Sequence, residues 1–177
     1  MNVSLADDQV EVQVQHGGGK LKCRKCGQVC PGYDKRSRRW RHLDTCQLKT
    51  LLVADVPRVE CKEHGVVTVE VPWAEPGSGF TALYEALVID WLKTAAVSAV
   101  AERLRLSWNA VDGIMQRAVR RGLSRRKTIQ PKRLSVDETA YRKGHDYITV
   151  VTDQESGTVL HVAEDRLTTS LGSFYEQ

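Results

Sequence analysis

Two stretches decide the fold of this chain: KLKCRKCGQVC at residues 20–30 and PRVECKEHG at residues 57–65. Each contains two possible metal ligands separated by two residues, and the pairs are Cys23/Cys26 and Cys61/His64. Such a gap lets both members of a pair reach one ion from a tight turn, and zinc prefers four nitrogen or sulfur donors in a tetrahedron. The spacing predicts a structural zinc ion in a β-rich, zinc-ribbon-like module.

Other interpretations of the cysteines remain open from the residues alone. Cys30, Cys46 or His42 could replace one of the four donors. The cysteines could instead be small buried apolar side chains without a metal. A catalytic zinc is not expected, because four protein donors leave no open position and no nearby glutamate is placed as a general base.

The hydrophobic pattern changes period along the chain, which predicts an α+β, multi-domain protein. Apolar residues alternate within residues 8–15, as expected for a strand. Residues 47–72 are rich in residue types that favour strands. A Pro- and Gly-rich linker follows at residues 72–79, and beyond it the apolar residues recur with the helical period. We therefore expect a zinc-binding module over residues 1–74, a helix-turn-helix module with a basic linker over 80–130, and a third module over 131–177.

Residues 97–121 resemble a helix-turn-helix, in which the second helix enters the major groove of DNA. Ser107 can cap this second helix, and Gly122 can end it. Its core face would hold Val111, Ile114, Met115 and Ala118. An ordinary helical hairpin with a polar face is the alternative. The candidate DNA contacts here and in the following basic run are Asn109, Gln116, Arg117, Arg120, Arg121, Arg125 and Arg126.

Charge is distributed unevenly, with 23 Lys/Arg against 14 Asp/Glu in residues 1–136 and 3 against 8 in residues 137–177. The basic part suits a polyanion, because Lys and Arg neutralise phosphates and release counterions. Nine of its basic residues fall within residues 20–41, interleaved with two aromatic residues. Candidate DNA contacts in this segment are Arg38, Arg39, Trp40 and Arg41. The alternative is a solvated loop whose Trp40 packs in the core.

After the basic run the pattern returns to strands, at residues 134–137, 147–152 and 158–163. Asp137 is expected at the end of the first strand, and residues 153–157 form a hairpin turn. A carboxylate on a first strand followed by an antiparallel hairpin is typical of the start of a ribonuclease-H-like nuclease. By spacing alone, a solvated Asp137 without a catalytic role is the simpler interpretation.

Ordered motifs along nearly the whole chain support a family resemblance. They are Cys23–Cys26, RWRHLD at 39–44, PRVECKEHG at 57–65, VPWA at 71–74, EALVID at 85–90, IMQRAVRRGL at 114–123, VDE at 136–138, RKGHDY at 142–147 and VAEDR at 162–166. With these motifs the chain resembles the N-terminal part of transposases of the insertion-sequence family ISL3.

This resemblance implies a zinc module that uses Cys23, Cys26, Cys61 and His64, a helix-turn-helix, and an Asp-Asp-Glu domain that cuts and joins DNA with Mg²⁺. Of the three catalytic acids only the first carries over, onto Asp137. The third module is then a truncated ribonuclease-H-like β-meander, and Mg²⁺ is expected only if a complete catalytic domain is assembled.

We therefore expect a transposase fragment that recognises double-stranded DNA at terminal inverted repeats and does not catalyse strand transfer by itself. Self-association, or pairing with intact transposase, is a further expectation. One alternative is a metal-dependent nuclease completed in trans by another chain. Another is a zinc-stabilised protein-interaction module without a DNA role.

The sequence contains no apolar run of the roughly 20 residues that a membrane helix needs. Its first residues also lack the basic and apolar regions of a signal peptide. We expect a cytoplasmic protein without membrane partners, in which the five cysteines stay reduced.

Overall fold

The computed structural model describes residues 2–6, 9–126, 130–142, 146–164, 171–172 and 174. The chain divides into two units, Met1–Ser124 and Arg125–Gln177. The first unit contains both the β-rich residues 1–74 and the three helices, for which the sequence pattern predicts separate domains.

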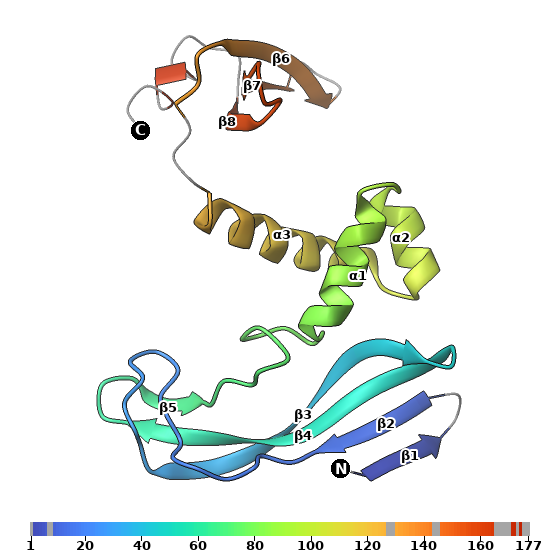
Figure 1. Cartoon of the computed structure of the whole chain (residues 1–177), viewed down its shortest axis with the longest axis vertical. Helices are drawn as coiled ribbons and strands as arrows, with labels where there is room; N and C mark the ends of the chain where they lie inside the picture. The colour runs from blue at the N-terminus through green and yellow to red at the C-terminus, as the bar shows by residue number, and fades with distance from the viewer. Residues whose placement is uncertain are drawn as a thin grey trace. The chain divides into compact units, whose positions relative to one another are not determined.

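The first unit is built on a five-stranded sheet (Figure 1). The order of four strands is β1-β2-β4-β3, and the fifth, β5, pairs with the far part of β4. Among these described strands, only β2 and β4 pair in parallel. The strands are β1 (Asn2–Ala6), β2 (Gln9–Val14), β3 (Gly32–Thr45), β4 (Leu48–Cys61) and β5 (Gly65–Thr68).

Residues 32–41 of the basic segment 20–41, for which a loop was the alternative, belong to the 14-residue strand β3, which pairs along nearly all of β4. Its sequence lacks clear alternation because β3 lies at the edge of the sheet and its first six residues are exposed on both faces. Trp40 gives the strand its inward side. This residue is 1 % exposed, and its ring packs edge-on against Trp73 at 5.5 Å, beside Ala54 and Val56.

Three helices complete the described part of the first unit: α1 (Ala82–Leu92), α2 (Val97–Leu104) and α3 (Trp108–Ser124). Thr81 caps α1 through the backbone N–H of Tyr84, and Ser107 Oγ accepts the N–H of Ala110 at 3.2 Å as expected. The helix α3 does not end at Gly122 but continues to Ser124, because Gly122 does not adopt the left-handed backbone of a helix C-cap.

The three helices share a small apolar core. Tyr84, Val88 and Val100 are buried there against α3. The predicted inward residues Val111 and Ile114 are confirmed, since each is 0 % exposed. Met115 and Ala118, also predicted for this face, are half-buried.

Among the described residues, no helix combines the length and the apolar character that crossing a membrane requires.

The second unit is a three-stranded antiparallel meander of order β6-β7-β8. Its strands are β6 (Leu134–Arg142), β7 (Asp146–Asp153) and β8 (Val159–Glu164). The hairpin turn at residues 153–157 is confirmed. The first strand is longer than expected, so Asp137 lies inside β6, opposite Val150, and not at its end. The last ten residues, whose sequence looks like the start of a helix, lie largely outside the described residues.

Candidate zinc site and nucleic-acid interface

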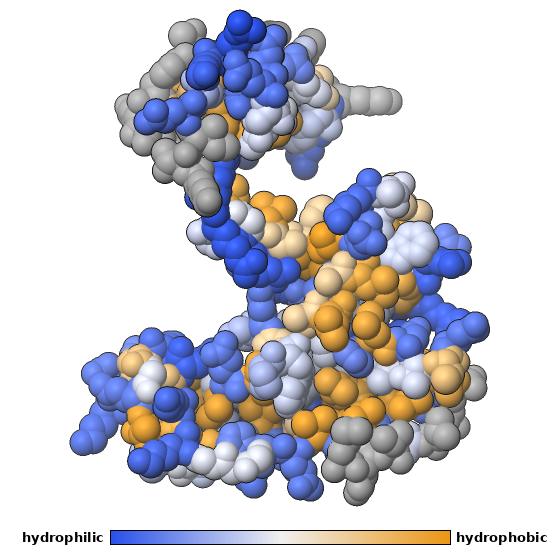
Figure 2. Space-filling view, viewed as in Figure 1, coloured by the Kyte–Doolittle hydropathy of each residue, from blue (hydrophilic) through white to orange (hydrophobic). Residues whose placement is uncertain are grey.

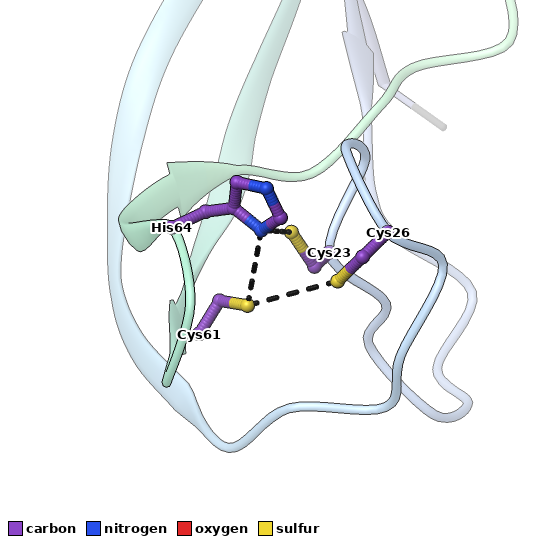
Figure 3. Close-up of side chains that lie close together, drawn as sticks. All are labelled: Cys23, Cys26, Cys61 and His64. Carbon is purple, nitrogen blue, oxygen red and sulfur yellow. Dashed lines mark hydrogen bonds between the residues drawn. The ribbon is translucent and has the colours of Figure 1, made fainter.

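The structure brings together the four residues that the spacing selected. Cys23 and Cys26 come from the turn between Lys22 and Val29, Cys61 ends β4, and His64 precedes β5. Their side chains point toward one another (Figure 3), and their ligand atoms all lie within 4.8 Å. Two strands and two turns that are distant in sequence therefore converge on one point.

The distances within this cluster suit a tetrahedral zinc ion. The Sγ atoms of Cys26 and Cys61 are 3.7 Å apart, and His64 Nδ1 lies 3.5 Å from Cys61 Sγ and 3.9 Å from Cys23 Sγ. Zinc–sulfur bonds of about 2.3 Å and zinc–nitrogen bonds of about 2.0–2.1 Å give tetrahedral edges of roughly 3.6–3.8 Å. The three thiols and one imidazole fit this metal, and a full protein set suits a structural role.

Both turns of the cluster depend on glycine. Gly27 follows Cys26 with φ of 73°, and its N–H donates to the carbonyl of Cys23 at 2.8 Å. Gly65 follows His64 with φ of 65°. Left-handed backbone of this kind is readily adopted only by glycine, so each turn can tighten around its ligand pair. The two glycines thus shape the site.

The thiols of the cluster differ in acidity. Hydrogen bonding to His64, helped by nearby backbone N–H groups, lowers the pKa of Cys61 to about 6. The backbone N–H of Gln28 lowers the pKa of Cys26, but burial and the neighbouring thiols outweigh it and raise the value to about 11. Without metal, one thiolate and one thiol would therefore stand side by side at neutral pH. A divalent cation relieves this competition, because it favours thiolates at both positions.

The rival ligands have other contacts. Cys30 Sγ lies 3.5 Å from the carbonyl oxygen of Gln28, and His42 Nδ1 is 2.9 Å from Thr81 Oγ1. Cys46 is exposed in the turn between β3 and β4. None of the three belongs to the four-residue cluster, which is the one such group among the described residues.

The helices α2 and α3 meet at a short turn, as a helix-turn-helix requires. Arg105 ends α2 in a left-handed conformation, with φ of 53° and ψ of 47°. Asn109 lies in the first turn of α3, and Gln116 and Arg120 lie further along it. All three side chains are exposed, so each is accessible to DNA.

Comparison with known proteins agrees with this geometry. Residues 69–119 match the helix-turn-helix domain of transposase family ISL3. Residues 20–64 match the zinc-finger of transposase IS204/IS1001/IS1096/IS1165. Residues 134–177 match a transposase domain of the ISL3 family. The chain belongs to the ISL3 family of transposases. No solved structure matches it.

Curated relatives support the membership. The transposase for insertion sequence element IS1557 of Mycobacterium tuberculosis is 34 % identical over 161 residues, which are 88 % of this chain and 36 % of the relative. The transposase for IS1001 of Bordetella parapertussis is 27 % identical over 159 residues, 89 % of this chain and 39 % of the relative. The chain therefore spans under two-fifths of the length of these ISL3 relatives.

Several predicted DNA contacts of this ISL3 chain are used internally. Trp40 is a core residue, and as the ring stands no base can stack on it. Arg41 forms an ion pair with Asp44 and lies over the ring of Tyr84, with its side chain 10 % exposed. Neither residue is therefore available to DNA in the way that the sequence predicts.

A buried carboxylate that the sequence did not reveal holds two further candidates. Glu85 of α1 is 2 % exposed and accepts hydrogen bonds from Ser78 Oγ at 2.8 Å and Arg117 Nε at 2.9 Å. Arg121 reaches the same carboxylate at 3.2 Å and also pairs with Glu75. These bonds fix α3 to α1 and the linker. Glu85 lies within a regular apolar helix pattern, so its charge at that position is the one sequence signal that could have indicated a buried carboxylate.

Other predicted arginines remain at the surface. Arg39 pairs with Glu11 at 3.0 Å yet keeps a 60 % exposed side chain. Arg38 lies over the Trp40 ring and donates to the carbonyl of Ser78. Arg125 and Arg126 of the second unit are exposed, and Arg126 donates to the carbonyl of Leu160.

Two acids of the second unit have different surroundings. Asp137 is exposed on β6 and accepts a hydrogen bond from Thr139 Oγ1 at 3.3 Å. Asp153 is 6 % exposed and holds the hairpin turn, where the Ser156 hydroxyl and the N–H groups of residues 155 and 156 lower its pKa. Asp153 therefore acts as a turn residue, whereas Asp137 is accessible for chemistry.

Proposed function

We propose that this ISL3 chain recognises the terminal inverted repeats of an insertion sequence in double-stranded DNA. The observation that carries the proposal is the helix-turn-helix, whose α3 presents Asn109, Gln116 and Arg120 to solvent. Asparagine and glutamine pair with adenine in the major groove, and arginine pairs with guanine or with phosphate. Arg38, Arg39, Arg125 and Arg126 add phosphate contacts.

The zinc ion has a supporting role in this proposal. Cys23, Cys26, Cys61 and His64 would hold it, and the ion would fix the end of β4 and the start of β5. Nothing is left open on the metal for substrate. Its contribution is to keep the basic strand β3 in register with β4, so that the arginines of β3 stay on a rigid support.

In the second unit, Asp137 is the proposed first acid of an Asp-Asp-Glu site. Such a site holds Mg²⁺ through two or three carboxylates from different elements. A single exposed aspartate does not suffice, so binding rather than strand transfer is the activity to measure for residues 1–177. Cleavage would require further carboxylates beyond these residues, and self-association or pairing with intact transposase would be one way to supply them.

DNA binding is tested by fluorescence anisotropy with a terminal-repeat duplex and a scrambled duplex of equal length. We expect the repeat to bind more tightly, with an affinity that falls steeply as salt rises. Asn109→Ala and Gln116→Ala should each reduce the preference for the repeat, while Ser98→Ala, on an exposed position of α2, should not. Absent or salt-insensitive binding would favour a protein-interaction module instead.

The catalytic alternative has a separate test. Mg²⁺-dependent nicking of repeat DNA by this chain, abolished in Asp137→Ala and retained in Glu138→Ala, would show that a complete site assembles. We expect no nicking by the chain alone and unchanged DNA affinity in both variants.

A further inference from the structure

A cleft of about 580 Å³ separates the turn of the β3–β4 hairpin from the ends of α1 and α2. Its walls come from three places: the hairpin turn, the last turn of α1, and the turn between α2 and α3. The lining residues are Arg41, Asp44, Gln47, Lys49, Trp91, Arg103, Leu104 and Arg105. In Figure 2, hydrophilic residues gather on the side of the first unit where α2 faces the hairpin tip.

The charge of this cleft is positive and unneutralised. Asp44 is its one acid, and Asp44 is already paired with Arg41. Lys49, Arg103 and Arg105 are exposed and make no ion pair within the part of the chain that the structure describes. This differs from α3, where Arg117 and Arg121 are neutralised by Glu85 and Glu75.

One of these cations is held in place by an aromatic ring. The guanidinium of Arg103 lies over Trp91 at 5.5 Å from the ring centroid, and Trp91 is 38 % exposed. Stacking of this kind limits the freedom of the arginine and leaves its N–H donors directed at an incoming ligand. Basic side chains beside an accessible aromatic ring suit a nucleic-acid backbone.

Backbone strain provides an independent argument. Among the described residues, only Cys46, Gln47 and Arg105 combine a side chain with a positive φ. Gln47 and Arg105 both line this cleft. Hairpin turns, such as the one at Gln47, and helix ends, such as the one at Arg105, ordinarily use glycine or asparagine, for which left-handed backbone costs little. Strained residues that persist at one site suggest that their side chains are needed there.

We infer that this cleft binds phosphates of the DNA backbone, adjacent to the bases that α3 reads. Arg105 is four residues from Asn109, so a duplex that meets the start of α3 also passes the turn carrying Arg105. Lys49 on the hairpin and Arg103 on α2 would contact the same strand. The inference rests on the proposed function and deepens it, because it makes the zinc module and the helices one composite surface.

The test compares Lys49→Ala, Arg103→Ala, Arg105→Ala and the triple variant with the wild type, using repeat-duplex anisotropy at several salt concentrations. Each phosphate interaction that a substitution removes should reduce the slope of log affinity against log salt by about 0.9. The matched control is Lys93→Ala, which removes a 69 % exposed cation of the same unit outside the cleft and should leave the slope unchanged. An unchanged slope in the triple variant would overturn the inference.

Arg105→Gly separates binding from folding. Glycine relieves the left-handed strain, so the melting temperature should stay constant or rise while DNA affinity falls as in Arg105→Ala. Parallel losses of stability and affinity would instead argue against a binding role for Arg105.

The two proposals fail differently. If the wild type binds no duplex, the proposed function and the cleft inference both fall. If the wild type binds and Asn109→Ala loses repeat preference, while the triple variant keeps its affinity and salt slope, only the cleft inference falls.

Discussion

The turns at the two ends of the β3–β4 hairpin use different residue types in left-handed backbone. At the zinc end, the left-handed positions are glycines, Gly27 and Gly65, and the functional groups are the neighbouring ligands. At the turn end, Cys46 and Gln47 carry side chains through left-handed backbone, with φ of 51° and 66°. The difference teaches that left-handed backbone costs little at the zinc end, where glycine adopts it, whereas at the other end it is strained and places Gln47 at the wall of the cleft beside the helices.

The largest expected effect is at the zinc end. Removing zinc with a chelator, or changing Cys61→Ser, should remove a binding free energy that reaches about 10–16 kcal/mol for structural zinc in small modules. Hydrogen–deuterium exchange should show reduced protection around residues 20–30 and 57–69. Protection in α1 and α3 should persist, because those helices have their own core. Cys46→Ser is the control, and unchanged protection in zinc-free protein would refute the metal site.

The three helices are held together by the ion pairs of a buried carboxylate, Glu85, and not by a metal. Glu85→Ala removes the buried partner of Arg117 and Arg121, and only Arg121 keeps a second acid, Glu75, so the substitution should cost about 1–3 kcal/mol of unfolding free energy. Urea denaturation followed by circular dichroism measures this cost. Glu102→Ala, an exposed acid on α2, should change stability by less than about 0.5 kcal/mol. Equal effects of the two substitutions would mean that the buried network does not hold α3.

At the zinc end, the affinity for zinc should depend on pH. Zinc must displace the proton of Cys26, whose pKa is about 11, at any pH near neutrality. Below about pH 6 it must also displace the proton that Cys61 then binds. Zinc affinity should therefore fall at least about tenfold per pH unit near neutrality and more steeply below pH 6. Competition with a zinc indicator from pH 8 to about pH 5 measures this, and a pH-independent affinity would contradict the ligand set.

The smallest effects come from exchanging the turn chemistries. Gly65→Ala imposes a side chain on left-handed backbone in otherwise open space, so it should destabilise by about 1 kcal/mol. Gln47→Gly should stabilise by a similar amount, because it relieves the same strain. Thermal melts of the two variants test the comparison directly. Destabilisation by Gln47→Gly would show that its side chain contributes packing that exceeds the strain.

Local sequence signals predicted much of this molecule. The ligand pairs at Cys23/Cys26 and Cys61/His64, the cap at Ser107 and the inward residues Val111 and Ile114 follow from short-range spacing. Strand β3 was harder to predict. Its exposed edge position leaves both faces free for charged residues, so the alternation that marks a strand is visible only around Trp40.

By itself the sequence determined the ISL3 membership and predicted the two ligand pairs of the zinc site, because both depend on residue types at fixed short intervals. The separate modules predicted for residues 1–74 and 80–130 share one unit, Met1–Ser124, instead. Only the tertiary structure decided which arginines are free. Arg117 and Arg121 look identical to Arg120 in the sequence, but Glu85 and Glu75, more than 30 residues away, pair with the first two. Pairing of charges depends on which elements pack together, and that information is absent from local spacing. The same is true of the cleft that gathers Lys49, Arg103 and Arg105.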